Sequence, residues 1–113
     1  MTQVNVRLDE LEYAGSFAVD SGQAMIGDPC YLGDWQTNDN DEWKPESHAG
    51  EYSYQGACQA TLTKDYGAIG GVRAVAMSTG YGDGLYPVYV KRNSEGRISF
   101  AVIDFEGDFD ENN

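Results

Sequence analysis

The sequence predicts an all-β protein, either an antiparallel β-sandwich or a partly open barrel, with about seven short strands. Fourteen glycines against three prolines favour short strands joined by tight turns. Apolar and polar residues alternate in most segments, and turn-forming residues separate the segments about every dozen residues. At 113 residues the chain is long enough for one domain with a single hydrophobic core. We therefore assign residues 1–105 to one β domain and residues 106–113 to an acidic tail that frays.

Three strands are expected before Asp28, at residues 4–8, 13–19 and 23–26. The turn-forming sequence "DSG" separates the second strand from the third, so these two predict a β-hairpin. Asp28 and Pro29 then suit the N-cap and the first position of a helix. We expect at most one short helical turn there, near Pro29–Leu32.

Four further strands are expected after a long polar loop at residues 36–50. Small apolar residues alternate with polar ones over residues 52–63, and strands are also expected at residues 72–78 and 85–91. The last strand follows "RNSEG", which suits a turn closed by a left-handed glycine, so the final two strands predict a hairpin. Because the last strand is apolar on both faces, we expect it at the centre of a sheet. Pro87 lacks an amide donor, which places the preceding strand at an edge or at a bulge.

The charge balance restricts the classes of partner. Nineteen acidic residues against seven basic ones give a net charge of -12, which argues against direct binding to nucleic acid or to an anionic membrane. A solvated surface, cation binding and docking onto a basic partner remain open. The chain shows neither a signal-peptide pattern nor an apolar run near the roughly 20 residues of a membrane helix. These features predict a cytoplasmic protein, in a cell or in an infected host.

Residues that commonly carry chemistry are scarce. The glycine clusters "GAIGG" and "GYGDG" precede strands and lack the lysine of a phosphate loop, so they predict turns. The acidic runs lack the spacing of a calcium loop, and His48 with the isolated Cys30 and Cys58 gives no zinc ligand set. Without CxxC spacing the two cysteines are expected to be free thiols. We expect no metal and no cofactor, and the sequence does not predict an enzyme.

Aromatic and acidic residues at the predicted turns form the candidate binding site. The short helical turn would bring Tyr31 and Trp35 onto one face, over one end of the sheet, where they either seal the core or line a pocket with Tyr81 and Tyr86. Tyrosine and tryptophan are enriched at binding hot spots. The candidate residues are Asp28, Tyr31, Trp35, Tyr81, Asp83 and Tyr86.

Two stretches resemble a family of small uncharacterised bacterial and phage domains. They are "DSGQAMIGDPCYL" and "GDGLYPVYVKRNSEGRISFAVIDF", and together they cover about a third of the chain. Members of that family pair an S/T-G-x5-D-P segment with a later D-G-x-Y-P-V segment and a closing hairpin. The matching residues here are Ser21, Gly22, Asp28, Pro29, Asp83, Gly84, Tyr86, Pro87 and Val88. The resemblance implies no activity, and it implies that Asp28 and Asp83 belong to one structural or functional unit.

Three hypotheses about function follow. The first is a non-catalytic binding or accessory domain that contacts a protein partner or a small ligand through the aromatic and acidic turns. The second is an acidic decoy that mimics nucleic acid and inhibits a basic protein, which the five acidic residues between Asp104 and Glu111 favour. The third is a hydrolase that uses the carboxylates of Asp28 and Asp83. Oligomeric state is left open.

Overall fold

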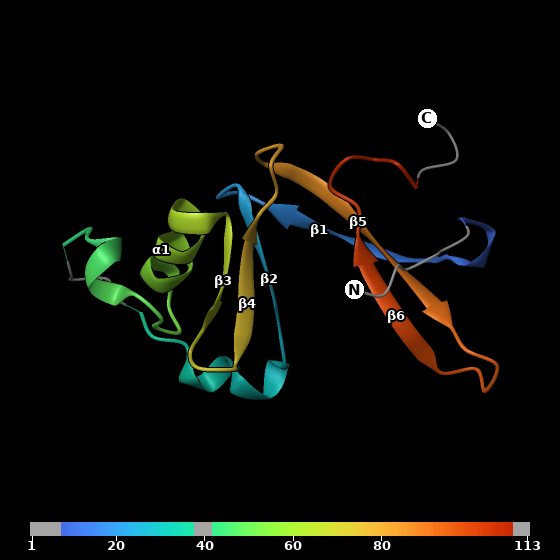
Figure 1. Ribbon diagram of the computed structural model, residues 1–113, viewed down its shortest axis with the longest axis horizontal. Helices are drawn as coiled ribbons and strands as arrows, with labels where there is room; N and C mark the ends of the chain where they lie inside the picture. Colours follow the sequence, from blue (N-terminus) through green and yellow to red (C-terminus); the bar gives the residue numbers. More distant parts are fainter. Residues whose placement is uncertain (1–7, 38–41, 110–113) are drawn as a thin grey trace. The chain divides into compact units, whose positions relative to one another are not determined.

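The computed structural model describes residues 8–37 and 42–109. The chain divides into two units, each with one antiparallel three-stranded sheet (Figure 1). We call Met1–Asp20 with Asp83–Asn113 the terminal unit, and Ser21–Gly82 the central unit. The prediction of a mostly β, antiparallel protein is confirmed. The described residues form six strands rather than about seven, and the sandwich or barrel and the single domain over residues 1–105 stay predictions.

The sheet of the terminal unit has the order β1-β5-β6, with β1 at Glu12–Val19, β5 at Gly84–Arg92 and β6 at Ile98–Ile103. The strand that we expected at the centre, β6, is therefore an edge strand. The strand that contains Pro87 is the central one, and its register is regular at Pro87, so both expectations are wrong.

Pro87 is tolerated in the central strand β5 because the amide donor that proline lacks would lie at the end of the β5–β6 ladder. Its carbonyl accepts a hydrogen bond from the Asp104 amide at 3.1 Å, just beyond the last residue of β6. In an antiparallel strand the N–H and C=O of one residue face the same neighbour. The N–H that Pro87 lacks would therefore donate to Asp104, beyond the last residue of β6, so its absence removes only the hydrogen bond at the very end of the β5–β6 ladder.

The hairpin between β5 and β6 is confirmed. The Gly96 amide donates to the Asn93 carbonyl at 3.0 Å, and Gly96 has a φ of 80° in the left-handed region. The Asn93 side chain strengthens the turn by accepting from the amides of Glu95 and Arg97. Local turn chemistry was sufficient to predict this connection.

The sheet of the central unit has the order β2-β4-β3, with β2 at Gln23–Gly27, β4 at Ala74–Ser78 and β3 at Tyr66–Ile69. The bounds of β1 and β2 agree with the expected strands, but the predicted hairpin between them is wrong. β1 pairs with β5, whereas β2 pairs with β4. The turn residues of "DSG" make the chain change direction without deciding which strand becomes the neighbour.

The segment expected as a strand at residues 52–63 is the helix α1, Tyr54–Lys64. Ser53 is its N-cap, and the buried Ser53 hydroxyl accepts from the Gly56 amide at 3.0 Å. Ala57 and Ala60, three residues apart, are buried against the sheet, whereas Leu62 is 76% exposed. The alternation in the sequence was therefore mistaken for a strand pattern.

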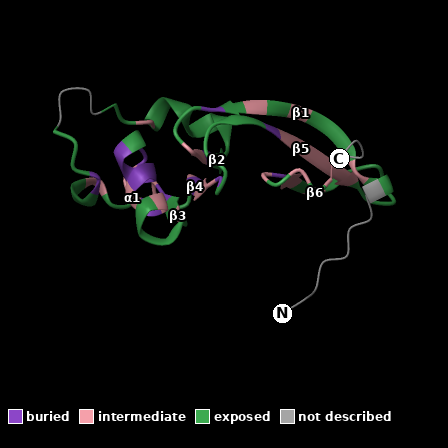
Figure 2. Ribbon diagram, turned by 90° about the horizontal axis from the view of Figure 1, so that it is seen from above, coloured by how far each residue is buried: buried purple, intermediate pink, exposed green. Residues whose placement is uncertain are grey.

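Small residues let α1 approach the sheet closely. A Cβ at Gly67 would lie 3.1 Å from the Ala60 Cβ, which shows how little room separates the helix from β3. Figure 2 shows the buried residues concentrated on α1, and Figure 1 shows the helix alongside β3. Trp35 packs against the core of this unit, which comprises Tyr52, Ala57, Ala60, Ile69, Ala74 and Ala76.

Three short 3-10 helices complete the described elements: η1 at Leu8–Glu10, η2 at Pro29–Asp34 and η3 at Pro45–His48. η2 confirms the helical turn predicted near Pro29–Leu32, but α1 and the other two 3-10 helices show that the limit of one such turn was wrong. Most of the strand expected at residues 4–8 lies outside the described residues. Within the described parts of the chain, no helix is long and apolar enough to cross a membrane.

Candidate functional site

The turn η2 forms as its sequence dictates. The Asp28 side chain accepts a hydrogen bond from the Cys30 amide at 2.9 Å, and Pro29 occupies the first turn, where no amide donor is needed. The Tyr31 amide donates to the Asp28 carbonyl at 3.1 Å. In the described structure Asp28 thus acts as the cap that starts this turn.

Trp35 and Tyr31 have different surroundings. The Trp35 ring lies edge-on against the buried Tyr52, with ring centroids 5.0 Å apart and planes 81° apart. Tyr31 is exposed, and the Arg73 guanidinium lies 5.5 Å from the centre of its ring. A 3-10 helix has three residues per turn, so residues four apart do not align as they would in an α-helix. Trp35 belongs to the core, and Tyr31 belongs to a polar surface around Arg73.

A small cavity of about 150 Å³ lies between α1 and the sheet, beside Trp35. Trp35, Met25 and Tyr54 supply its larger apolar side chains, and Ser21 and Gln23 supply its polar ones. The Gln23 side chain also donates to the Cys58 sulfur at 3.2 Å. Cys30 and Cys58 are both free thiols, the first exposed and the second buried.

Arg73 is held in place by contacts with two residues of η2 and with the backbone of Gly70. Its Nε donates to the Asp34 carboxylate at 3.3 Å, and its Nη1 donates to the Gly70 carbonyl at 2.9 Å. With the Tyr31 ring beneath it, the guanidinium is positioned from three directions. Within the described residues its Nη2 group makes no hydrogen bond.

Arg73 lines a polar pocket of about 440 Å³ at the end of the sheet where η2 lies. The polar pocket is lined by Asp34, Gln36, Gly50, Glu51, Tyr52, Gly70, Gly71 and Arg73. The Gly70 amide donates to the Gly50 carbonyl at 2.8 Å and so joins two walls of the pocket. A Cβ at Gly70 would lie 2.7 Å from the Tyr52 Cβ, and Gly70 has a φ of 62°, so a side chain is excluded there.

His48 and Glu51 form a second polar pair beside the polar pocket. The His48 Nδ1 lies 3.0 Å from one Glu51 oxygen and 3.1 Å from the other. Both side chains are partly buried, and η3 ends at His48 while Glu51 lines the pocket. The Glu51 carboxylate therefore has the His48 imidazole as its partner.

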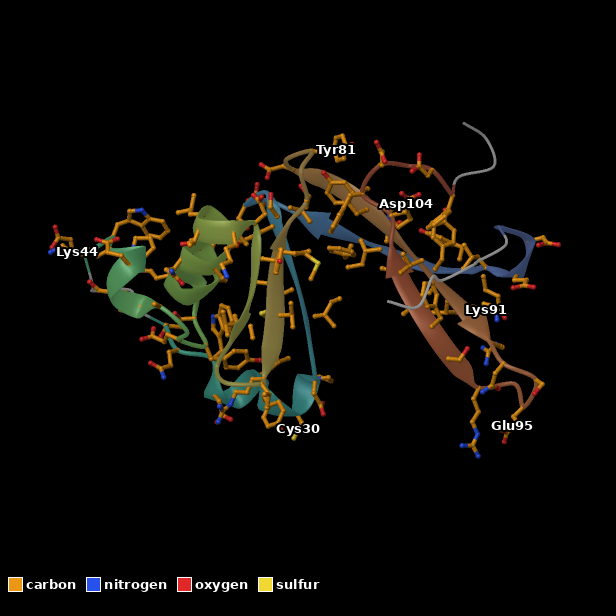
Figure 3. The ribbon with its side chains drawn as sticks, viewed as in Figure 1. Cys30, Lys44, Tyr81, Lys91, Glu95 and Asp104 are labelled. Atoms are coloured by element: carbon orange, nitrogen blue, oxygen red, sulfur yellow. The ribbon has the colours of Figure 1, made fainter. Side chains whose placement is uncertain are left out.

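Tyr81 lies far from η2, within the same unit. β2 and β4 are antiparallel with Gly27 opposite Ala74, so the residues after β2 and those after β4 leave opposite ends of the sheet. Figure 3 shows Tyr81 and Cys30 at these opposite ends. The expectation that Tyr31, Trp35 and Tyr81 line one pocket is therefore wrong, because strand direction separates them.

Asp83 and Tyr86 belong to the terminal unit. Asp83 directly precedes β5, and Tyr86 lies in this strand. Asp83 is exposed, whereas Tyr86 is buried between the rings of Phe17 and Phe105, at 6.4 and 5.2 Å. Asp28 and Asp83 thus lie in different units. A role in binding for any of the six candidate residues stays a prediction.

The acidic end of the terminal unit is organised by one buried carboxylate. Asp104 accepts hydrogen bonds from the amides of Glu106, Gly107 and Phe109, at 3.2, 2.8 and 2.8 Å. The Phe109 ring packs edge-on against Tyr89, with centroids 6.1 Å apart. Residues 110–113 lie outside the described residues, and the fraying of the tail stays a prediction.

Glu106 raises the pKa of the exposed Asp108. Its negative charge is the main cause, and a hydrogen bond between the two side chains, slight burial and Asp104 act in the same direction. The folded protein therefore holds this proton more strongly than the unfolded chain. The resulting stabilisation is complete below the ordinary pKa of an aspartate, and it is lost as the pH rises through the raised pKa.

We predict that Glu106→Gln lowers the pKa of Asp108 towards its ordinary value, because the substitution removes the dominant repulsive charge. Titration of the Asp108 carboxyl carbon by NMR measures this shift. Glu95→Gln, on the turn between β5 and β6, is the control, and it should leave the titration unchanged. An unaltered Asp108 titration in the Glu106 variant would contradict the assignment of the cause.

Residues that could hold a metal are not gathered in the described structure. Among residues 8–37 and 42–109, no group of three or more His, Cys, Asp and Glu side chains has the arrangement of a metal site. Asp39 and Asp41, the centre of one acidic run, lie outside these residues. Sequence reasoning did not single out Arg73, and the available signal was a lone basic residue two positions after the glycine pair Gly70–Gly71.

The fold and site define a small, mostly β protein with a polar pocket at the end of one sheet. A family model described as a protein of unknown function, DUF4241, matches residues 2–103. The chain belongs to this family, which confirms the resemblance to an uncharacterised domain family. No curated protein and no solved structure matches the chain.

Proposed function

We propose that the protein is a non-catalytic binding module that holds a small ligand, through an anionic group of that ligand, in the polar pocket. The observation that carries the proposal is the restrained guanidinium of Arg73. An arginine offers five N–H donors, and the described contacts of Arg73 use one on Nε and one on Nη1. The Nη2 group remains for a carboxylate or phosphate oxygen, and arginine commonly binds such groups through two parallel hydrogen bonds.

Preorganisation favours binding at Arg73. Asp34, the Gly70 carbonyl and the Tyr31 ring hold the side chain before a ligand arrives, which reduces the entropy lost on binding. Both carboxylates of the polar pocket already have cationic or hydrogen-bonding partners, Asp34 in Arg73 and Glu51 in His48. Their repulsion of an anion is therefore reduced.

The turn η2 helps to hold Arg73 in the polar pocket. Tyr31 supports the arginine from below, Asp28 starts the turn that carries Tyr31, and Asp34 ends it. A pocket of about 440 Å³ is within the size range of small-molecule sites, which favours a small ligand over a large partner at this position. The decoy and hydrolase hypotheses remain alternatives, and no contact described above favours either.

The test is an NMR titration of the full chain with defined probes: inorganic phosphate, a phosphate monoester, a set of mono- and dicarboxylic acids, and free amino acids. We expect at least one probe to shift the resonances of Gly71 and Arg73. Arg73→Ala should weaken that binding by about tenfold or more, the effect of losing a charge-assisted hydrogen bond.

The matched control is Arg97→Ala, which removes the same charge from an exposed position of the terminal unit. This variant should bind the probe as the unmodified chain does. The proposal is overturned if no probe shifts the pocket resonances, or if the Arg73 and Arg97 variants bind equally well.

A further inference from the structure

A second surface of the central unit carries an exposed tryptophan, Trp43, on a loop that a buried side chain holds in place. Trp43 is 57% exposed, although it belongs to the most hydrophobic class of side chains. The backbone on either side of it is fixed by Gln55, which is only 4% exposed. The Gln55 side chain accepts from the Lys44 amide at 2.8 Å and donates to the Glu42 carbonyl at 3.4 Å. A buried side chain of α1 thus holds the loop while the indole stays in solvent.

Trp43 forms one wall of a groove of about 370 Å³ between η3 and α1. Leu62 and Pro45 supply its other apolar side chains, and the Trp43 ring lies 5.8 Å from that of the exposed Tyr54. We call the groove lined by Trp43, Pro45, Glu46, Gln59, Leu62 and Thr63 the tryptophan groove. In Figure 3, Lys44 marks this loop on the side of α1 away from β3.

We propose that the tryptophan groove docks a basic, amphipathic peptide segment of a partner protein. The apolar side chains of that segment would cover Trp43 and Leu62, and its basic side chains would face Glu46 and Glu42. Tryptophan is among the side chains most enriched at binding hot spots, and the neighbouring exposed Leu62 enlarges the apolar surface that a partner would cover. Because Gln55 already fixes the loop, little further ordering is needed when a partner docks.

Charge decides which occupant fits the groove. Glu46 is the charged residue in its lining, and the Lys44 ammonium at its edge is paired with the exposed Glu42 at 3.2 Å. A second copy of the chain would bring another net charge of -12, and the repulsion disfavours self-association. The acidic tail of the same chain is disfavoured for the same reason. A basic segment gains from both the apolar wall and the surrounding charge.

The test begins with a displayed library of random 12-residue peptides, selected against the full chain. We expect the enriched peptides to combine basic residues with at least one large apolar residue. Synthesised versions should bind the unmodified chain, and their affinity should fall as the salt concentration rises. Trp43→Ser and Leu62→Ser should each weaken binding by about tenfold or more.

Val72→Ser is the matched control because Val72, in the same unit, is 98% exposed and lies outside the groove. It should change the affinity by less than about twofold. Glu46→Lys should weaken binding of the basic peptides and leave the thermal unfolding of the chain unchanged. Circular dichroism of every variant establishes that folding is retained.

Three results would overturn the proposal: no peptide is enriched, the enriched peptides lack basic residues, or Trp43→Ser binds them as the unmodified chain does. Arg73→Ala should leave peptide binding intact, because Arg73 does not line the groove. Failure at the polar pocket and failure at the tryptophan groove are therefore distinguishable.

Discussion

Gly56→Ala is expected to destabilise the central unit by about 3 kcal/mol, the cost of overpacking at a site that cannot relax. A Cβ at this position would overlap the Glu51 carbonyl oxygen and lie 2.8 Å from the Glu51 carbonyl carbon. Both atoms are backbone, and the Glu51 carbonyl also accepts the Ser53 amide at 3.0 Å. Relief of the overlap would therefore disturb the cap that starts α1.

Helix propensity alone predicts the opposite sign for this substitution. Alanine is favoured over glycine inside a helix by about 1 kcal/mol, so an isolated helix would be stabilised. Urea unfolding followed by circular dichroism decides between the two. Gly33→Ala is the control, because nothing lies within 4 Å of a Cβ there, and it should change stability by less than about 0.5 kcal/mol. A Gly56 variant as stable as the unmodified chain would contradict the close approach to Glu51.

Local signals in the sequence were sufficient for several elements. The strands β1, β2 and β4 to β6 were placed within a few residues, because alternation and turn residues act over short distances. The cap at Asp28 and the left-handed Gly96 followed from side-chain and backbone chemistry within four residues. Strand pairing was harder to predict for β1, because its partner β5 is distant in the sequence.

The helix α1 was missed because its buried face consists of small residues. Ala57 and Ala60 create little contrast with the polar residues around them, so the period of 3.6 residues is weak. The stronger signal was Ser53, which caps the helix by accepting from the Gly56 amide. Only the packing of α1 on the sheet shows that these alanines are a core rather than one face of a strand.

For the candidate site too, the sequence predicted the local turn but not the contacts between distant residues. Asp28 and Tyr31 were placed on one turn correctly because η2 is a local structure, whereas Tyr81 was grouped with them wrongly because strand direction was unknown. Arg73 acquires its position from Asp34, which is 39 residues away in the sequence. Trp43 lies in a segment expected to be a structureless loop, and its anchor is Gln55 of the unpredicted helix. Long-range contacts therefore define both surfaces.

Trp35→Ala is expected to cost about 3 kcal/mol of unfolding free energy, the low end of the range for removing a core tryptophan, because Trp35 is partly buried against the core. The substitution removes the edge-on contact with the buried Tyr52 and enlarges the adjoining cavity of about 150 Å³. Tyr81→Ala is the comparison, because Tyr81 is 60% exposed on a turn at the other end of the sheet. Its cost should stay below about 1 kcal/mol. Urea unfolding followed by circular dichroism measures both.

The Trp35 variant also decides between the two roles that the sequence left open, a plug for the core or the lip of a ligand site. Trp35 does not line the polar pocket, so its loss should lower stability and leave the affinity of a ligand at Arg73 within about twofold. The opposite pattern, unchanged stability with lost affinity, would contradict its assignment to the core. We expect the plug, because the contact of Trp35 with Tyr52 faces α1 and the sheet, whereas Arg73 is held by Asp34, Gly70 and Tyr31 without any contribution from the indole.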